Sequence, residues 1–179
     1  MTDRERPPIS TGGGDDGTTT LLGAGRMSKH DARIVVLGEI DEASSFIGLA
    51  RAEAKSEGDM AGVLIGLQRL LYRMMGDFAM PNEENTVKGT DVEYLDATVE
   101  EWRGRTELPN EFVIPGETSL GAQLDVARSV VRRAERSLTV AGYARTHPDA
   151  FKVVNRLSDL LFVLARNADD TYARSREQD

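Results

Sequence analysis

Apolar residues recur every three or four positions along most of this chain, and no other feature of the sequence constrains the fold as strongly. Within residues 33–56 and 60–80 this spacing places the apolar side chains on one face of a helix. The first stripe consists of Ile40, Ala43, Ile47, Ala50 and Ala54, and the second of Leu64, Leu67, Leu71, Met74 and Phe78. Each stripe has to be buried against another element, so the two segments are predicted to be packed helices.

Local signals mark a third helix and the connection that follows it. Thr90 and Glu93 have the spacing of a capping box, and they predict a helix that ends near Arg103. Residues 108–119 hold two prolines and a glycine. A connection with a short extended piece is therefore expected there.

The fourth and fifth helices are predicted to occupy most of the remaining chain. Thr118 or Ser119 can cap the fourth helix, and Gly142 stands where a C-terminal stop belongs. Pro148 suits the first turn of the last helix, which is predicted to cover about residues 149–174. The buried stripe of the last helix comprises Val153, Val154, Leu157, Leu160, Leu161 and Leu164.

These segments predict one all-α domain, a bundle of roughly five helices with almost no strand signal. A length of 179 residues fits a single core, and 40% hydrophobic with 29% charged residues is typical of a globular protein. We expect a disordered tail at residues 1–9, a loop at residues 10–30 and the bundle at residues 31–176.

Charge and residue usage argue against several classes of function. The net charge of −8 disfavours wholesale binding of nucleic acid or of an anionic membrane. Without cysteine, and with His30 and His147 as the only histidines, the chain offers no thiolate chemistry and little basis for a zinc site. No apolar run approaches the ~18–20 residues that cross a bilayer, and the first ten residues lack a secretion segment. We expect a cytoplasmic protein.

A row of arginines is the most unusual feature of the predicted fourth helix. Arg128, Arg132 and Arg136 recur every four residues and so project from one face, with Arg133 beside them. Like charges at this spacing repel, so other groups have to compensate for them. Salt bridges to neighbouring helices would do so. Alternatively, the row binds a polyanion, because the planar guanidinium matches pairs of phosphate oxygens.

The Gly/Thr-rich segment "STGGGDDGTTTLLGAGRMSK" at residues 10–29 offers groups suited to phosphate. Its glycines allow backbone N–H groups to converge on an anion, its threonines offer hydroxyl donors, and Lys29 offers a cation. Asp15 or Asp16 could meet Mg²⁺, directly or through water. The segment is not a Walker P-loop, and such a terminus alone is more often disordered than functional. Leu21 and Leu22 argue against a purely disordered tail.

Further polar residues lie within apolar patterns. Asn155, Asp159, Phe162 and Arg166 fall along one side of the last helix, where an ordinary ion pair of Asp159 with Arg156 is the simpler interpretation. Asp41 lies amid the apolar stripe of the first helix. We expect Asp41 to be partly buried and paired with an arginine from another helix or subunit.

Several separated motifs together resemble one family, the PduO-type ATP:cob(I)alamin adenosyltransferases. The resemblance is carried by "TGGGDDGTTTLLGAGRMSK", "IDEASSFIG", "FVIPGE", "ARSVVRRAER" and "NRLSDLLFVLAR", and it extends from about Thr11 to Arg166. The last two motifs are highly specific. The resemblance implies a ferritin-like five-helix bundle that assembles as a homotrimer with its active site between subunits. The implied reaction transfers the 5′-deoxyadenosyl group of ATP to the cobalt of cob(I)alamin and releases triphosphate.

The resemblance also implies roles for particular residues, with residues 10–30 as the nucleotide-binding loop. Arg132, Arg128 and Asp41 would be catalytic, the last two as a pair that bridges subunits, and Phe112 would face the corrin and help exclude a lower axial ligand. The ATP site would comprise Thr11, Gly12, Gly13, Gly14, Thr19, Thr20, Lys29, Arg132, Arg133, Glu135, Arg136 and Asn155. The implied substrates are ATP and cobalamin, and the implied metal ion is Mg²⁺. A flavin-type reductase and a cobalamin-dependent mutase are possible partners.

The sequence departs from the family pattern at a few positions. Gly12 and Gly13 replace a lysine and a threonine, Glu117 replaces a glycine, and Ala43 and Ser44 replace a leucine and an asparagine. These changes are expected to lower ATP affinity or loop order rather than to change the reaction. An alternative is a non-catalytic relative that binds ATP or adenosylcobalamin as an escort or sensor. A third interpretation is a helical interaction module whose arginines form only salt bridges.

Overall fold

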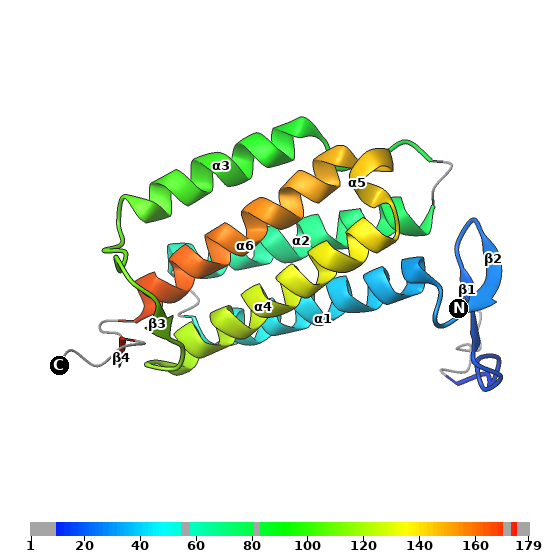
Figure 1. Cartoon of the computed structure of the whole chain (residues 1–179), viewed down its shortest axis with the longest axis horizontal. Coiled ribbons are helices and arrows are strands. Elements are labelled where there is room, and N and C mark those ends of the chain that lie inside the picture. The colour runs from blue at the N-terminus through cyan, green and yellow to red at the C-terminus, as the bar shows by residue number, and fades with distance from the viewer. Residues whose placement is uncertain (1–9, 55–57, 81–82, 170–172, 175–179) are drawn as a thin grey trace, which may run out of the picture.

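The computed structural model describes residues 10–54, 58–80, 83–169 and 173–174, and the tail expected at residues 1–9 lies outside these ranges. Five long helices run side by side within the described residues, and a single-turn helix joins the last two (Figure 1). They are α1 (Ala32–Glu53), α2 (Asp59–Ala79), α3 (Gly89–Arg103), α4 (Ser119–Val140), α5 (Tyr143–Thr146) and α6 (Pro148–Ala168). The predicted helical bundle is confirmed.

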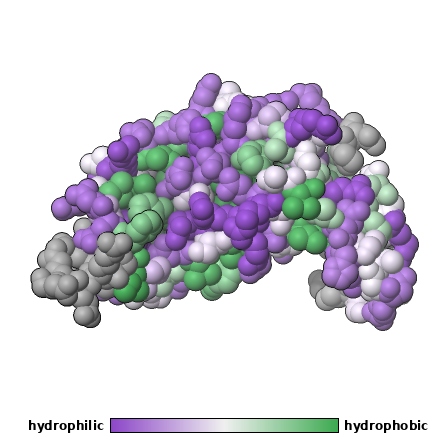
Figure 2. All heavy atoms as spheres, in the orientation of Figure 1, coloured by the Kyte–Doolittle hydropathy of each residue, from purple (hydrophilic) through white to green (hydrophobic). Residues whose placement is uncertain are grey.

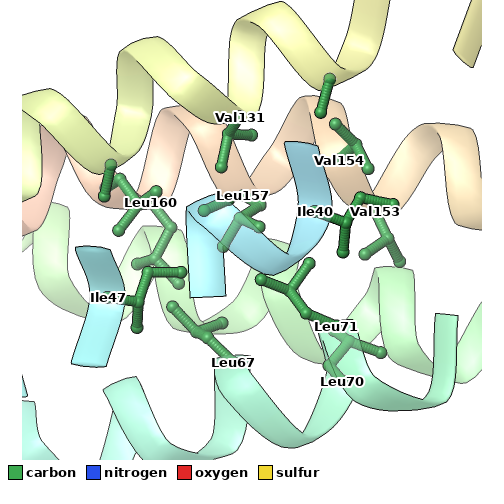
Figure 3. Packing of buried hydrophobic residues seen from close by; sticks show 14 of the residues in the cluster. Ile40, Ile47, Leu67, Leu70, Leu71, Val131, Val153, Val154, Leu157 and Leu160 are labelled. Atoms are coloured by element: carbon green, nitrogen blue, oxygen red, sulfur yellow. The ribbon is translucent and has the colours of Figure 1, made fainter. Parts of the chain in front are cut away.

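The predicted stripes form the core. Helix α1 packs against α2 and α4, while α6 packs against α4 and α3, so α1, α2, α4 and α6 enclose a common interior. Figure 3 shows this interior, with Ile40 and Ile47 of α1 facing Leu67 and Leu71 of α2 beside Leu157 of α6. All five side chains are at most 1% exposed, so each has left water almost completely. Burial of this kind stabilises the bundle by roughly 1.5–3 kcal/mol per large aliphatic side chain.

Three of the predicted helix boundaries are confirmed. The Thr118 hydroxyl accepts a hydrogen bond from the Gly121 N–H at 2.9 Å and caps α4. Gly142 follows α4 with φ of 78°, a left-handed conformation that glycine adopts without strain. Pro148 occupies the first turn of α6, where its missing N–H has no intrahelical partner to lose.

Two other boundary predictions are wrong. Helix α3 begins at Gly89, and the Asp91 carboxylate accepts the Lys88 N–H at 2.9 Å, so the cap lies two residues before the expected Thr90–Glu93 box. Helix α6 ends at Ala168, six residues before the expected Arg174. Asp169 is extended there, with φ of −95° and ψ of 121°. Strand β4 (Ala173–Arg174) pairs antiparallel with β3 (Val113–Ile114), the short extended piece predicted between α3 and α4.

The segment before α1 contains a hairpin that the sequence did not predict. Strands β1 (Thr18–Leu21) and β2 (Gly25–Ser28) pair antiparallel, with Thr18 opposite Ser28. Figure 1 shows the hairpin beyond the N-terminal end of α1, at the edge of the bundle. Leu21 is buried, whereas Leu22 is 67% exposed.

The face shown in Figure 2 is largely hydrophilic, with smaller hydrophobic areas between the polar side chains. Within the described part of the chain, none of the helices has both the length and the apolar character needed to cross a bilayer.

Candidate functional site

Helix α4 presents two of its arginines to solvent without acidic partners. Its opposite side is buried through Val131, Ala134 and Leu138, which turns Arg132 and Arg136 outward. The Arg136 Nη1 donates to the Arg132 carbonyl at 2.9 Å, so this guanidinium lies along the helix toward Arg132. Among the described residues, neither side chain has a carboxylate within 4.0 Å. These two guanidinium groups remain available to an anion.

Arg133 instead joins α4 to α1. Its Nε lies 3.3 Å from a carboxylate oxygen of Glu39, and its Nη2 donates to Glu42. The Glu39 side chain is only 15% exposed, so this contact is partly withdrawn from water. The salt-bridge interpretation therefore describes Arg133 better than it describes Arg132 or Arg136.

An open groove of about 460 Å³, here called the arginine groove, lies between α3, α4 and α6. Arg132, Arg128, Arg156, Asp159 and Phe162 are among its lining residues. Partial burial raises the pKa of Asp159, and the nearby guanidinium groups of Arg156 and Arg132 act in the opposite direction. Four arginines and three acids line the groove, and Asp96 and Glu100 pair with Arg156 and Arg103, so Arg128 and Arg132 are the lining arginines not engaged with α3.

Two of the predicted ATP-site residues meet beside the arginine row. The Asn155 Nδ2 of α6 donates to Glu135 of α4 at 3.2 Å. The Asn155 Oδ1 accepts from Arg156 at 3.0 Å, which fixes the orientation of the amide. The structure thus brings Glu135 and Asn155 to one place across the seam between α4 and α6.

A second open cavity of about 640 Å³, here called the Phe112 cavity, lies under the connection between α3 and α4. Phe112 is 87% exposed at its edge, so this ring is not part of the hydrophobic core. Arg128 and Phe162 line both this cavity and the arginine groove. These two residues therefore mark the junction between the two spaces.

The floor of the Phe112 cavity holds a buried ion network that sequence reasoning missed. Asp125 accepts from the Arg128 Nε at 3.2 Å and from the Arg166 Nη2 at 2.5 Å. Arg166 also pairs with Asp169 at 3.0 Å, and Asp169 accepts from the Thr118 hydroxyl at 2.8 Å. The spacing of Asp125 and Arg128, three residues apart within an apolar face of α4, was the available signal.

The Gly/Thr-rich segment is held together mainly by its own polar groups. Asp16 accepts from the Thr18 N–H at 2.9 Å and from the Thr18 hydroxyl at 2.7 Å, and these bonds lower the pKa of Asp16. Arg26 donates to the Gly13 carbonyl at 2.7 Å and to Asp16 at 3.1 Å. The carboxylate of Asp16 is thus engaged in organising the loop.

Lys29 reaches the same loop from the end of β2. Its N–H donates to the Gly17 carbonyl at 3.0 Å, and its Nζ lies 3.3 Å from the point where a side chain on Gly14 would begin. Gly12 and Gly17 have φ of 67° and 79°, which only glycine adopts without strain. Residues 12–15 form a tight turn beside the Lys29 ammonium group, closed by the Asp15 N–H, which donates to the Gly12 carbonyl at 3.2 Å. Thr11 precedes the turn, and its hydroxyl accepts from the Gly13 N–H at 3.4 Å.

A third open space of about 740 Å³, here called the hairpin groove, separates the hairpin from α1 and α2. Thr19, Thr20 and Asp41 line it, together with the exposed Tyr72. Within one chain Asp41 has no arginine partner, because its side chain is exposed and forms no ion pair with any described residue. Glu39 and Glu42, not Asp41, lie on the side of α1 that faces α4.

The predicted site residues therefore form two separate groups within one chain. Thr19, Thr20 and Asp41 lie at the hairpin groove, whereas Arg128 and Arg132 lie at the arginine groove. No hydrogen bond or ion pair between described side chains joins residues 10–30 to α4. One chain alone does not assemble all of these residues around a single ligand.

Comparisons with known proteins agree on one family. A family model described as cobalamin adenosyltransferase matches residues 9–168. A cobalamin adenosyltransferase of Cupriavidus metallidurans is 36% identical over 94% of this chain and 96% of its own. A corrinoid adenosyltransferase of Mycobacterium tuberculosis is 38% identical over 90% of this chain and 88% of its own.

A similar solved structure leads to the same family. It is a variant of the PduO-type ATP:corrinoid adenosyltransferase of Lactobacillus reuteri, complexed with cobalamin and ATP. It superposes with a TM-score of 0.86 at 27% identity, covering 95% of this chain and all of the other.

Proposed function

This chain belongs to the cobalamin adenosyltransferase family, and on that premise we propose that it transfers the 5′-deoxyadenosyl group of ATP to the cobalt of cob(I)alamin. The observation that carries the proposal is the state of Arg132. This guanidinium is exposed at the wall of the arginine groove and forms no salt bridge with a described residue, and its charge opposes the burial that raises the pKa of Asp159. An unpaired guanidinium beside other arginines is suited to a polyphosphate.

In this reaction the protein has to position ATP and the corrinoid and to stabilise developing charge. Reduced cobalt supplies the electron pair of the new cobalt–carbon bond, the bond between C5′ and oxygen breaks, and triphosphate leaves with the electrons of that bond. No side-chain base is needed, because no proton has to be removed from the nucleophile. Arg132 and Arg136 would stabilise charge on the leaving triphosphate, and the loop of residues 11–14 with Lys29 would hold the nucleotide.

Asp15 is the residue that fits a Mg²⁺ ion bound with the nucleotide. Its carboxylate is exposed and has no ion pair among the described residues, whereas Asp16 is engaged by Thr18 and Arg26. Mg²⁺ is usually held by one or two carboxylates together with substrate phosphates and water. Within the described residues no three acids or histidines converge as a preformed metal site, so the ion would arrive with ATP. The ion would supply neutralisation of phosphate charge.

The proposed site lies between two copies of the chain, in a homotrimer. Within one chain the hairpin groove and the arginine groove are separate, yet both carry residues of the proposed ATP site. Asp41 is exposed and unpaired at the first of these grooves, and Arg128 lines the second. A second copy that brings Arg128 to Asp41 would place its arginine row opposite the hairpin. Light scattering after size exclusion measures the assembly directly, and a monomer with full activity contradicts this arrangement.

Phe112 is proposed to face the corrin. Its ring is 87% exposed at the edge of the Phe112 cavity, in a position to cover an apolar ligand surface. An apolar wall on the lower side of cobalt excludes the axial ligand, and cobalt with fewer ligands accepts an electron more easily. The same proposal places the reaction in the cytoplasm, with a flavin-type reductase as electron donor and a cobalamin-dependent mutase as recipient.

One spectrophotometric experiment tests the function. Purified protein is mixed with chemically reduced cobalamin and MgATP under anaerobic conditions, and the absorbance of cob(I)alamin is followed. We expect this absorbance to fall as a photolabile cobalt–carbon product forms, and neither change to occur without ATP. An escort or sensor would bind the ligands without changing the cobalamin spectrum. A helical interaction module would not gain thermal stability from MgATP, whereas an ATP site would gain it by mass action.

A further inference from the structure

The orientation of Arg128 is set by a buried carboxylate. The Asp125 side chain is 5% exposed, and one of its oxygens accepts from the Arg128 Nε at 3.2 Å. The Arg128 guanidinium lies 5.9 Å from the centre of the Phe162 ring. Arg128 is therefore directed toward Phe162, at the junction of the arginine groove and the Phe112 cavity.

Asp125 is itself fixed from the far end of α6. Its second oxygen accepts from the Arg166 Nη2 at 2.5 Å, and the Arg166 side chain is 1% exposed. Arg166 lies 5.5 Å from the centre of the Phe162 ring, so two guanidinium groups contact the same ring. This contact is favourable because the face of an aromatic ring attracts cations.

The network ends at the start of α4. Asp169 pairs with Arg166 at 3.0 Å and accepts from the Thr118 hydroxyl, which also caps α4. Gly121 leaves room for this carboxylate, since a Cβ there would come within 2.1 Å of the Asp169 Oδ1. The end of α6 and the start of α4 are thus held together by a network of contacts that includes Asp125.

We propose that Asp125 is a positioning residue, which acts through Arg128 to shape the corrinoid side of the site. This inference rests on the proposed function. Stability alone is a weak reason for such a network, because well-packed apolar residues often stabilise a protein as much as buried charges do. A buried network does, however, fix one orientation of a side chain that a solvated arginine would not keep. The side chain fixed here borders the cavity assigned to cobalamin at its junction with the arginine groove, and within the described residues no hydrogen bond or ion pair joins it to the loop assigned to ATP.

The proposal predicts an effect on one substrate. Asp125→Asn keeps the size of the side chain and removes the charge that holds Arg128. We expect the KM for reduced cobalamin to rise about tenfold, which corresponds to about 1.4 kcal/mol of lost binding. The KM for ATP should stay within about twofold, and Asp125→Glu should restore part of the loss. Equal changes in the two KM values would contradict the proposal.

A double-mutant cycle separates positioning from a general loss of structure. If Asp125 acts through Arg128, then Asp125→Asn changes kcat/KM for cobalamin by less than about twofold in the Arg128→Ala background. Additive losses in the cycle would overturn the proposal. Asp91→Asn is the matched control, because it removes an aspartate–arginine pair and a helix cap at the start of α3, remote from the Phe112 cavity. We expect it to lower stability and leave the KM for cobalamin unchanged.

A crystal structure of the Asp125→Asn variant provides a readout without turnover. We expect the Arg128 guanidinium to leave the Phe162 ring while α4 and α6 keep their places. If the Arg128 side chain keeps its position in the variant, the inference is overturned, whatever the activity of the variant. Failure of the wild-type protein to form adenosylcobalamin rejects the proposed function instead, so the two failures are distinguishable.

Discussion

Arg133 joins α4 to α1 through the carboxylate of Glu42, and it also lies 3.3 Å from Glu39. Its guanidinium is partly exposed, so the ion pairs contribute only modestly. We expect Arg133→Ala to lower the free energy of unfolding by about 1 kcal/mol. The KM for ATP should remain within about twofold, because this guanidinium already has acidic partners. Urea unfolding and steady-state kinetics measure the two effects, and a large rise in the KM for ATP would restore Arg133 to the ATP site.

For Arg132, one residue earlier, we expect the opposite result, a loss of activity without a loss of stability. It is exposed, lines the arginine groove and forms no salt bridge with a described residue. We expect Arg132→Ala to reduce kcat/KM for adenosyl transfer by about 10²–10³-fold, the usual loss when one charge-stabilising donor is removed. The melting temperature and the assembly state should not change. Turnover close to that of the wild type would remove Arg132 from the proposed mechanism.

The neighbouring arginines show which features of the site can be predicted from the sequence. Helical periodicity predicts that Arg128, Arg132 and Arg136 share a face, because this depends only on the geometry of one helix. It does not predict that Arg133 meets Glu39 and Glu42, because that depends on how α1 and α4 pack. Only the folded chain therefore shows that Arg133 forms salt bridges and that Arg132 forms none with a described residue.

The end of α6 illustrates the same limit. Local signals place Pro148 at its start correctly, but the predicted end was six residues too late. The stop at Asp169 depends on Thr118, which is 51 residues away in the sequence and donates to the Asp169 carboxylate. Strands of two to four residues, such as Thr18–Leu21, are likewise too short to give a periodic signal. Long-range partners, rather than local preference, decide these elements.

Gly14 tests the proposed role of the loop. A Cβ there would lie 3.2 Å from the Thr18 carbonyl oxygen and 3.3 Å from the Lys29 Nζ, so we expect Gly14→Ala to push the flexible Lys29 side chain aside by a few tenths of an ångström. We expect the KM for ATP to rise about tenfold, as for one charge-assisted contact weakened by about 1.4 kcal/mol. The KM for cobalamin and the melting temperature should change little. Titration with MgATP by calorimetry provides a direct check, and unchanged affinity would separate Lys29 from the nucleotide.

Gly121 and Gly62 form a matched pair for stability. Gly121→Ala places a Cβ within 2.1 Å of the Asp169 carboxylate and should destabilise the fold by about 1–3 kcal/mol, the usual cost of overpacking. Gly62 lies in α2 with open space around it, so Gly62→Ala should stabilise by roughly 0.5–1 kcal/mol through helix propensity. Both values come from denaturant unfolding. A neutral Gly121→Ala would show that Asp169 moves away at no cost.

We expect the buried His147 to make the folded protein less stable in mild acid. Its ring packs against Phe78 and Tyr143, with centroids 5.1 Å and 4.9 Å away, and burial lowers the pKa of His147 despite the nearby Asp77 carboxylate. The unfolded chain binds a proton to this histidine near pH 6.5, before the folded protein does. The stabilising contribution of neutral His147 is therefore complete above about pH 6.5 and is lost as the pH falls through the folded pKa.

The same argument gives a measurable slope. Between these two pKa values the free energy of unfolding should fall by at most about 1.4 kcal/mol per pH unit through this one group. Carboxylates contribute their own dependence in acid, so the comparison has to be made with a variant. We expect His147→Gln to be less stable at pH 7.5 but to lose less stability than the wild type between about pH 7 and pH 5. Parallel pH profiles for the two proteins would mean that His147 keeps the same pKa in the folded and unfolded chains, which its burial against two aromatic rings argues against.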